Sequence, residues 1–289
     1  MRIEGAVALI TGAERGLGRA LAVTLARRGA RLILSGLEQE PLDALRASIE
    51  ATGSQARALR CDLRDRAQIT ALVERANAEF GEIDVLVNNA GITVGGDIRL
   101  ISESDWDRVF DINLRGAVRV IDAVLPTMIT RGRGYIVNIA SAAGLVAPAL
   151  WIPYAASKFA LVGFSEGLRA ALRARGIAVS VACPMWIQTD MLTSVRPQLV
   201  DAASRCGTSQ PMARAWIQLM SRLRGHPMAP ETAARRIIRG VERERFMIYT
   251  HRTTRLVVSA RALAPNVFAR LWQYANEIDE RCRREAAAE

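Results

Sequence analysis

The sequence has 289 residues, 50% hydrophobic and 24% charged, which excludes global disorder and allows one large domain or two small ones. The net charge is +10, and residues 196–289 carry most of it, with 17 arginines and 9 acidic residues. Because these arginines are spread among apolar residues, we do not expect nucleic acid to be the main partner. The four cysteines are scattered and there are only two histidines, which disfavours a metal site or a Ser–His–Asp triad. The sequence has no long apolar run and no room for a signal peptide, so we expect a cytoplasmic protein.

Short apolar runs alternate with helical patterns along most of the chain. We predict strands over residues 6–11, 31–35, 55–60, 83–88, 134–140, 177–183 and 246–250. We predict helices over about residues 16–28, 39–51, 65–80, 102–112, 114–131, 154–175 and 230–243. The strands are unbroken apolar runs, which is typical of a parallel sheet covered on both faces. The sequence therefore predicts an α/β, three-layer, doubly wound fold.

The pattern changes twice after the sixth predicted strand. Residues 190–229 are rich in Met, Trp, Pro and Ser and lack periodicity, and we interpret them as a substrate loop. Residues 251–289 read as a helical extension interrupted at Pro265. We therefore expect one domain over residues 1–250 with the extension after it. Within 251–275, arginines alternate with apolar residues, which suggests a peripheral membrane contact, although a docked helix or a subunit contact is the commoner meaning.

The first strand runs directly into a glycine-rich turn, with glycines at positions 12, 16 and 18. Glycine allows a tight turn in which main-chain N–H groups approach a pyrophosphate, and the following helix adds about half a positive charge at its N-terminus. A glycine-rich turn without a ligand is the alternative. Because the turn joins a first strand to a first helix, it favours a dinucleotide-binding site.

The choice between NAD and NADP rests on the end of the second strand. An acidic residue there often binds the ribose 2′-OH of NAD, but this chain has Gly36 at that position. Arg15 in the turn is suited to a 2′-phosphate, unless it is only a solvated surface charge. Leu37 supplies no second arginine, and Glu38 would oppose a phosphate. The sequence weakly favours NADP over NAD.

A set of polar residues follows the strands at the same predicted edge of the sheet. Tyr154 and Lys158 are four residues apart on a helix and share a face. Ser141 ends the preceding strand, and Asn113 falls between two predicted helices. Lys158 is also the only lysine among 39 basic residues. Each residue alone has an ordinary structural explanation, but together, beside a dinucleotide turn, they favour carbonyl/alcohol redox chemistry.

The expected chemistry gives each residue a role. A neighbouring ammonium and an oxidised nicotinamide would lower the pKa of Tyr154, so that the phenol can act as acid or base near neutral pH. Ser141 would hold the substrate oxygen by a hydrogen bond. Lys158 would also bind ribose hydroxyls, and Asn113 would position a relay water.

On these motifs the chain resembles the classical short-chain dehydrogenase/reductase family over about residues 5–190. The matching residues are Thr11–Gly18, Asp62 and Leu63, Asn88–Gly91, Asn113, Ser141, Tyr154, Lys158, Pro184 and Thr189. The resemblance implies a Rossmann-type domain with seven parallel strands and an Asn113–Ser141–Tyr154–Lys158 tetrad. It also implies a homodimer or homotetramer packed through helices around residues 102–131 and 154–175.

The resemblance implies a cofactor site drawn from several parts of the chain. Asp62 and Leu63 would lie at the adenine, Asn89–Gly91 along the cofactor, and Thr189 near the carboxamide or phosphates. The full set of expected cofactor residues is Gly12, Arg15, Gly16, Leu17, Gly18, Asp62, Leu63, Asn89, Ala90, Gly91, Tyr154, Lys158, Pro184, Ile187 and Thr189.

The expected substrate is a hydrophobic carbonyl or alcohol. Where the family commonly has Pro-Gly after the sixth strand, this chain has Pro184 followed by Met185 and Trp186, which would reshape the pocket. The expected lining is apolar and consists of Trp151, Met185, Trp186, Met191 and Trp216. The alternative is that these residues only pack the loop onto the body of the protein.

Two other functions fit the same fold. An isomerase, epimerase or dehydratase would use a similar site and cannot be separated without a substrate. A non-catalytic NAD(P)-binding regulatory protein is the other alternative, and it is disfavoured because all four residues of the tetrad are present.

Overall fold

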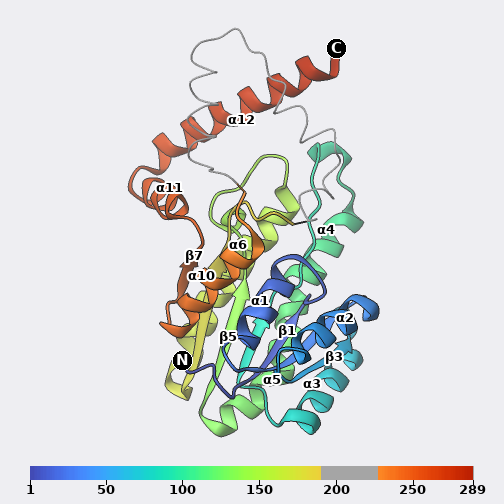
Figure 1. Cartoon of the computed structure of the whole chain (residues 1–289). Coiled ribbons are helices and arrows are strands. Elements are labelled where there is room, and N and C mark those ends of the chain that lie inside the picture. The colour runs from blue at the N-terminus through green and yellow to red at the C-terminus, as the bar shows by residue number, and fades with distance from the viewer. Residues whose placement is uncertain (190–226, 289) are drawn as a thin grey trace.

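A seven-stranded sheet forms the centre of the protein in the computed structural model, which describes residues 1–189 and 227–288 (Figure 1). The strands lie in the order β3-β2-β1-β4-β5-β6-β7 and every neighbouring pair is parallel. The strands are β1 (Val7–Thr11), β2 (Arg31–Gly36), β3 (Ala56–Arg60), β4 (Val85–Asn88), β5 (Gly134–Ile139), β6 (Ile177–Cys183) and β7 (Met247–Tyr249). The predicted doubly wound α/β fold is confirmed.

Helices cover both faces of the sheet. The helices are α1 (Gly16–Ala26), α2 (Gln39–Glu50), α3 (Arg66–Phe80), α4 (Glu103–Phe110), α5 (Ala117–Arg131), α6 (Ile152–Leu172), α10 (Pro230–Glu242), α11 (Arg252–Leu263) and α12 (Pro265–Ala288). Apolar side chains of α1, α2 and α10 form one core with the sheet, and those of α3, α5 and α6 form the other. The result is three layers, with the sheet in the middle.

The central strands are buried because their sequence is apolar at successive positions. All five residues of β1 are buried, as are all four of β4. A strand covered on both faces has no solvent side that would select polar residues at alternate positions. Each large aliphatic side chain buried in this way contributes about 1.5–3 kcal/mol before the entropy cost is counted.

The segment between α4 and α5 differs from the prediction. Two helices separated at Asn113 were expected, but a π-helical segment, Asp111–Gly116, joins α4 to α5 without a break. The Asn113 side chain does not cap a helix; it bonds the main chain of Ile92 and the hydroxyl of Ser157 instead. The wider π-helical turn lets this side chain point inward, as such turns often do at functional sites.

The last two helices lie at the end of the molecule opposite the N-terminus (Figure 1). Pro265 separates α11 from α12, as the sequence predicts. Three hydrogen bonds tie these helices to the segment that precedes α6. Arg261 donates to the carbonyl of Leu145, Trp272 Nε1 donates to the carbonyl of Ala147 at 2.8 Å, and Asn276 Oδ1 accepts from the Ala149 amide at 3.4 Å. Among the described helices, none is long and apolar enough to cross a bilayer.

Candidate active site

Lys158 lies at the centre of a buried group of polar side chains beyond the carboxyl ends of β4 and β5. Its side chain is 3% exposed, and Nζ donates to the carbonyl of Ile139 at 2.9 Å. Nζ also lies 5.8 Å from the centre of the Tyr154 ring. Burial lowers the pKa of Lys158 to about 8, because the ammonium has lost hydration. The only lysine of the chain is therefore held next to Tyr154, as expected.

Tyr154 and Ser141 meet at the start of α6. Ser141 follows β5, and its Oγ accepts from the Ala143 amide at 3.1 Å, which begins a short 3₁₀ turn. Burial raises the pKa of Tyr154, and its hydrogen bond with Ser141 opposes that rise. The direction is opposite to the expected lowering, because in this structure the loss of hydration of the phenolate is the largest effect.

Asn113 is buried behind this pair. Its Oδ1 accepts from the Ile92 amide at 2.8 Å, while Nδ2 donates to the Ile92 carbonyl at 2.9 Å and to Ser157 Oγ at 3.0 Å. A Cβ built on Gly91 would lie 3.2 Å from Asn113 Oδ1 and 3.4 Å from Lys158 Nζ. The structure thus brings all four predicted tetrad residues to one end of the sheet.

The glycine-rich turn is closely packed. Gly12 has a φ of +62°, and a Cβ there would lie 2.8 Å from Ala90 Cα. A Cβ on Gly18 would lie 1.9 Å from the Gly12 carbonyl oxygen. Asn89 fixes the turn from β4, because its Nδ2 donates to the carbonyls of Thr11 at 3.1 Å and Gly12 at 2.9 Å. The Asn89 side chain therefore braces the turn, a contact that the motif alone did not reveal.

The start of α1 fits a bound diphosphate. Arg15 occupies the N-cap position, and no side chain in the described residues caps the helix. The first-turn amides of a helix need hydrogen-bond acceptors, and phosphate oxygens are suitable ones. Thr189 lies against this turn, since its Cγ2 would be 3.1 Å from a Cβ on Gly16. Leu17 packs its side chain against the core. The residues present therefore fit a dinucleotide.

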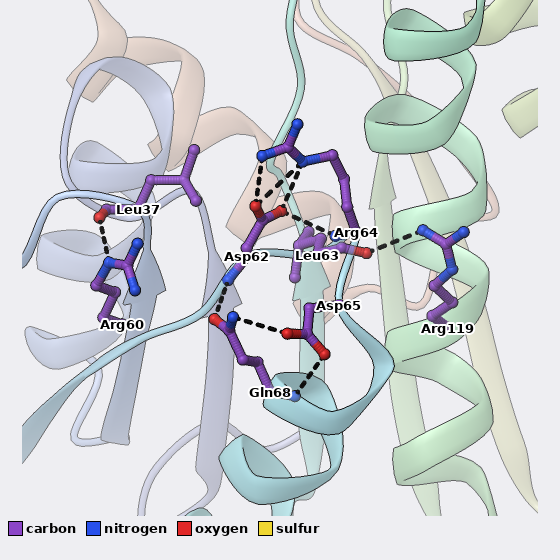
Figure 2. A network of polar contacts seen from close by, with 8 residues as sticks. All are labelled: Leu37, Arg60, Asp62, Leu63, Arg64, Asp65, Gln68 and Arg119. Atoms are coloured by element: carbon purple, nitrogen blue, oxygen red, sulfur yellow. Dashed lines mark hydrogen bonds and ion pairs between the residues drawn. The ribbon is translucent and has the colours of Figure 1, made fainter.

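A network of charged and polar side chains lies where β2 and β3 end (Figure 2). Asp62 forms a bidentate ion pair with Arg64, the shortest contact being 2.6 Å, and the hydrogen bond from Arg64 is the main reason why the pKa of Asp62 is lowered. Leu63 is buried, and its carbonyl accepts from Arg119 at 3.1 Å. Arg15, expected at a 2′-phosphate, pairs instead with Glu38 at 3.0 Å.

The segment after β6 lies along the same edge. The Pro184 carbonyl accepts from the Ala142 amide at 2.8 Å. Met185 is turned toward α11, since its amide donates to Thr250 Oγ1 at 3.3 Å and its sulfur contacts Thr254 at 3.7 Å. Trp186 has a φ of +46°, a left-handed conformation that costs a large residue on the order of 1–2 kcal/mol. Ile187 forms a bridge with Met228.

Of the expected substrate residues, Trp151 contacts the tetrad directly. Its ring packs edge-on against Tyr154, with ring centres 6.1 Å apart and planes at 89°. Met185 and Trp186 are half-buried. Met191 and Trp216, with most of the predicted substrate loop, lie outside the described residues. Ser157, which the sequence did not indicate as a site residue, links Asn113 to the main chain of Tyr154. Its position one residue before Lys158 was the only available signal.

The sequence profile of the short chain dehydrogenases matches residues 6–200. The chain belongs to the short-chain dehydrogenase family. It is therefore an NAD(P)-dependent oxidoreductase that interconverts carbonyls and alcohols, as the residues predict. Among curated relatives, the 3-oxoacyl-(acyl-carrier-protein) reductase FabG of Escherichia coli is 39% identical over 191 residues, which cover 66% of this chain and 77% of the relative.

Solved structures support the same family and the same cofactor class. A short-chain dehydrogenase/reductase from Burkholderia phymatum in complex with NAD has a TM-score of 0.78 and 31% identity, over 92% of this chain and 96% of that one. A single-residue variant of the actinorhodin polyketide ketoreductase with NADPH has a TM-score of 0.74 and 31% identity, over 86% and 96%. The neighbours hold either dinucleotide, so they support NAD(P) without separating the two.

Proposed function

We propose that Tyr154 is the acid/base of a carbonyl/alcohol oxidoreductase acting on a hydrophobic substrate. The observation that carries the proposal is the convergence of Tyr154, Ser141 and Lys158, with the phenol hydrogen-bonded to the serine and the amine beneath the ring. In reduction, the tyrosine hydroxyl gives its proton to the carbonyl oxygen; in oxidation, the phenolate accepts the proton of the alcohol. The bound nicotinamide supplies or accepts the hydride.

Ser141 and Lys158 assist the tyrosine in different ways. Ser141 holds the substrate oxygen beside the phenol through a hydrogen bond that needs no rearrangement during the reaction. The Lys158 ammonium stabilises the phenolate and binds ribose hydroxyls. Asn113, held by Ile92 and Ser157, positions a water that carries protons between Lys158 and solvent. A positive charge brought next to Tyr154 would counter the rise in its pKa that burial causes.

The test is a panel of hydrophobic ketones and alcohols assayed with NADH and NADPH, with Tyr154→Phe in parallel. Turnover by the wild type and its loss in the variant would support the assigned role. Unchanged turnover in Tyr154→Phe would defeat it.

The apolar side chain of Trp151 supports the hydrophobic substrate. Its ring stands beside Tyr154, where it forms a wall for a flat or branched apolar group. The E. coli relative is named as a reductase of 3-oxoacyl groups carried on acyl carrier protein, so its substrate is an acyl ketone. In the same panel, Trp151→Ala should raise KM for large ketones more than for small ones. Turnover of small polar sugars alone would contradict the proposal.

We also propose a homodimer or homotetramer packed through α4, α5 and α6. A Cβ on Gly163 or Gly167, one turn apart on α6, would meet no atom within 4 Å, which leaves room for a helix of a second copy. Light scattering after gel filtration should give the mass of two or four chains, and Gly163→Arg should lower it. A wild-type monomer would contradict this assembly.

The C-terminal extension, residues 251–289, is proposed to bring this cytoplasmic enzyme to an anionic membrane surface, while residues 1–250 form the catalytic domain. Leu263 is 86% exposed, and Leu256, Val267 and Leu271 are also exposed. Two arginines of the extension, Arg252 and Arg255, help to line a hollow of about 850 Å³, together with Arg236, Arg239, Arg243 and Arg245. Exposed apolar side chains beside arginines suit anionic lipid.

Vesicle flotation tests the membrane contact. The wild type should float with vesicles containing phosphatidylglycerol and not with pure phosphatidylcholine. Leu263→Asp combined with Leu271→Asp should abolish flotation. Equal flotation of the wild type and the double variant would contradict the proposed membrane contact.

A further inference from the structure

The carboxylate of Glu14 lies directly above Gly36, the last residue of β2. A Cβ built on Gly36 would be 2.0 Å from Glu14 Oε2 and 2.8 Å from Oε1. Glu14 Oε1 also accepts from the Leu37 amide at 3.4 Å. No side chain at position 36 fits unless Glu14 moves. The end of β2 has no acidic residue of its own, but Glu14 of the glycine-rich turn places a carboxylate there.

The inner oxygen of this carboxylate, Oε2, lacks a partner among the described residues. Glu14 Oε2 is buried and accepts no hydrogen bond from any described residue. A carboxylate oxygen removed from water without a donor costs free energy, and such atoms in native structures call for an explanation. A rotation of the carboxylate that turns this oxygen toward a hydroxyl of a ligand bound over β2 would satisfy it.

The basic side chains near β2 are already engaged. Arg15 pairs with Glu38 at 3.0 Å. Arg60 Nε donates to the Leu37 carbonyl at 3.1 Å. A 2′-phosphate would bring close to two negative charges into the neighbourhood of Glu14 and Glu38, and among the described residues Arg15 and Arg60 are both engaged already.

We infer that Glu14 is the specificity-determining residue at the adenosine ribose and that the enzyme binds NAD(H) in preference to NADP(H). The inference rests on the proposed dinucleotide site. In dinucleotide-binding folds an acid at the end of the second strand accepts a hydrogen bond from the ribose 2′-OH. Glu14 offers the same acceptor from a different element. The preference is the reverse of the one that Arg15 suggests in the sequence alone.

The test measures equilibrium binding of NADH and of NADPH by the fluorescence of the reduced nicotinamide, without any carbonyl substrate. The wild type should bind NADH about tenfold more tightly, or better, as expected for a hydrogen bond to a charged group. Glu14→Gln removes the charge and should bring the ratio of the two Kd values close to one. Glu40→Gln, at an exposed acid of α2, makes the same change in net charge and should leave the ratio unchanged.

A second pair of variants moves the acid from one element to the other. Gly36→Asp alone places two carboxylates in one space and should weaken the binding of both dinucleotides. Glu14→Ser combined with Gly36→Asp should restore the preference for NADH. Tighter or equal binding of NADPH by the wild type, or an unchanged ratio in Glu14→Gln, would overturn the role of Glu14 alone. Failure of both dinucleotides to bind would overturn the dinucleotide site and this inference with it.

Discussion

The catalytic end and the adenosine end of the proposed cofactor site are built differently. Tyr154, Lys158 and Asn113 are each at most 7% exposed, and main-chain carbonyls and amides fix the lysine and the asparagine. At the adenosine end, Arg15 and Glu38 are both more than half exposed and are held mainly by each other. Buried polar groups must be satisfied in one arrangement, whereas exposed ion pairs contribute little and rearrange easily. The side chains that carry the chemistry are thus fixed by burial, whereas Arg15 and Glu38 can rearrange when a dinucleotide binds.

The largest expected effect is at the catalytic end. Tyr154→Phe should lower kcat by about 10²–10⁴-fold, because the proton donor is removed, while NADH binding changes little. Steady-state turnover and dinucleotide fluorescence measure the two quantities. Tyr135→Phe is the matched control, since this tyrosine is also buried but bonds Ser180, and it should keep wild-type turnover. Equal losses in both variants would mean that the tetrad has no special role.

The pKa of Lys158 predicts a pH dependence of stability. Because the folded pKa is about 8 and the ordinary value is 10.5, the unfolded chain holds a proton between these values that the folded protein has lost. Rising pH therefore favours folding across this window, by roughly 3 kcal/mol in total. Urea denaturation of the wild type and Lys158→Met from pH 7 to 11 should show this rise in the wild type only. Parallel curves would contradict the buried charge.

Gly18→Ala tests the packing of the glycine-rich turn, which lies between the catalytic end and the adenosine end. Its Cβ would lie 1.9 Å from the Gly12 carbonyl, so the main chain must shift, at a cost of about 1–3 kcal/mol in the free energy of unfolding. NADH binding should weaken as well. Arg27→Ala, at the exposed C-terminal end of the same helix, is the control and should keep stability. A stable Gly18→Ala variant would show that the turn is looser than its packing indicates.

The smallest effect is expected at the adenosine end. Asp62→Asn removes an ion pair with Arg64 that is exposed on the arginine side and should cost less than about 1 kcal/mol near neutral pH. The hydrogen bond from Arg64 lowers the pKa of Asp62, so its contribution is present above the ordinary value of 3.8 and is lost as pH falls through the folded value. Urea denaturation of the wild type and of Asp62→Asn at pH 7 and pH 3 measures the size of this contribution and its loss in acid. A larger loss of stability at pH 7 would contradict the difference between the two ends, because it would mean that Asp62 is held as firmly as the catalytic residues.

The sequence predicts the fold and the catalytic end well, for a physical reason. Apolar runs can be buried only in a covered parallel sheet, and strand ends then bring Ser141, Tyr154 and Lys158 to one edge. Spacing along the chain is enough to place these residues. The π-helical turn at Asn113 was missed, because it depends on the contact with Ile92, which is distant in the sequence.

The adenosine end could not be predicted in the same way. Glu14 and Gly36 are 22 positions apart, and nothing in either segment alone shows that the carboxylate of one fills the space left by the other. Arg15 appears available in the sequence because its pairing with Glu38 depends on side-chain rotamers. Residues whose position depends on another element's side chain are therefore those that only a structure can assign.

The solitary lysine gives the folded enzyme a simple labelling behaviour. Lys158 is 3% exposed, and its amine donates to the Ile139 carbonyl. An acylating reagent should therefore modify position 158 only when α6 separates from the sheet. Mass spectrometry of that one peptide would follow the opening of the proton-transfer centre, with no other lysine to compete for the reagent.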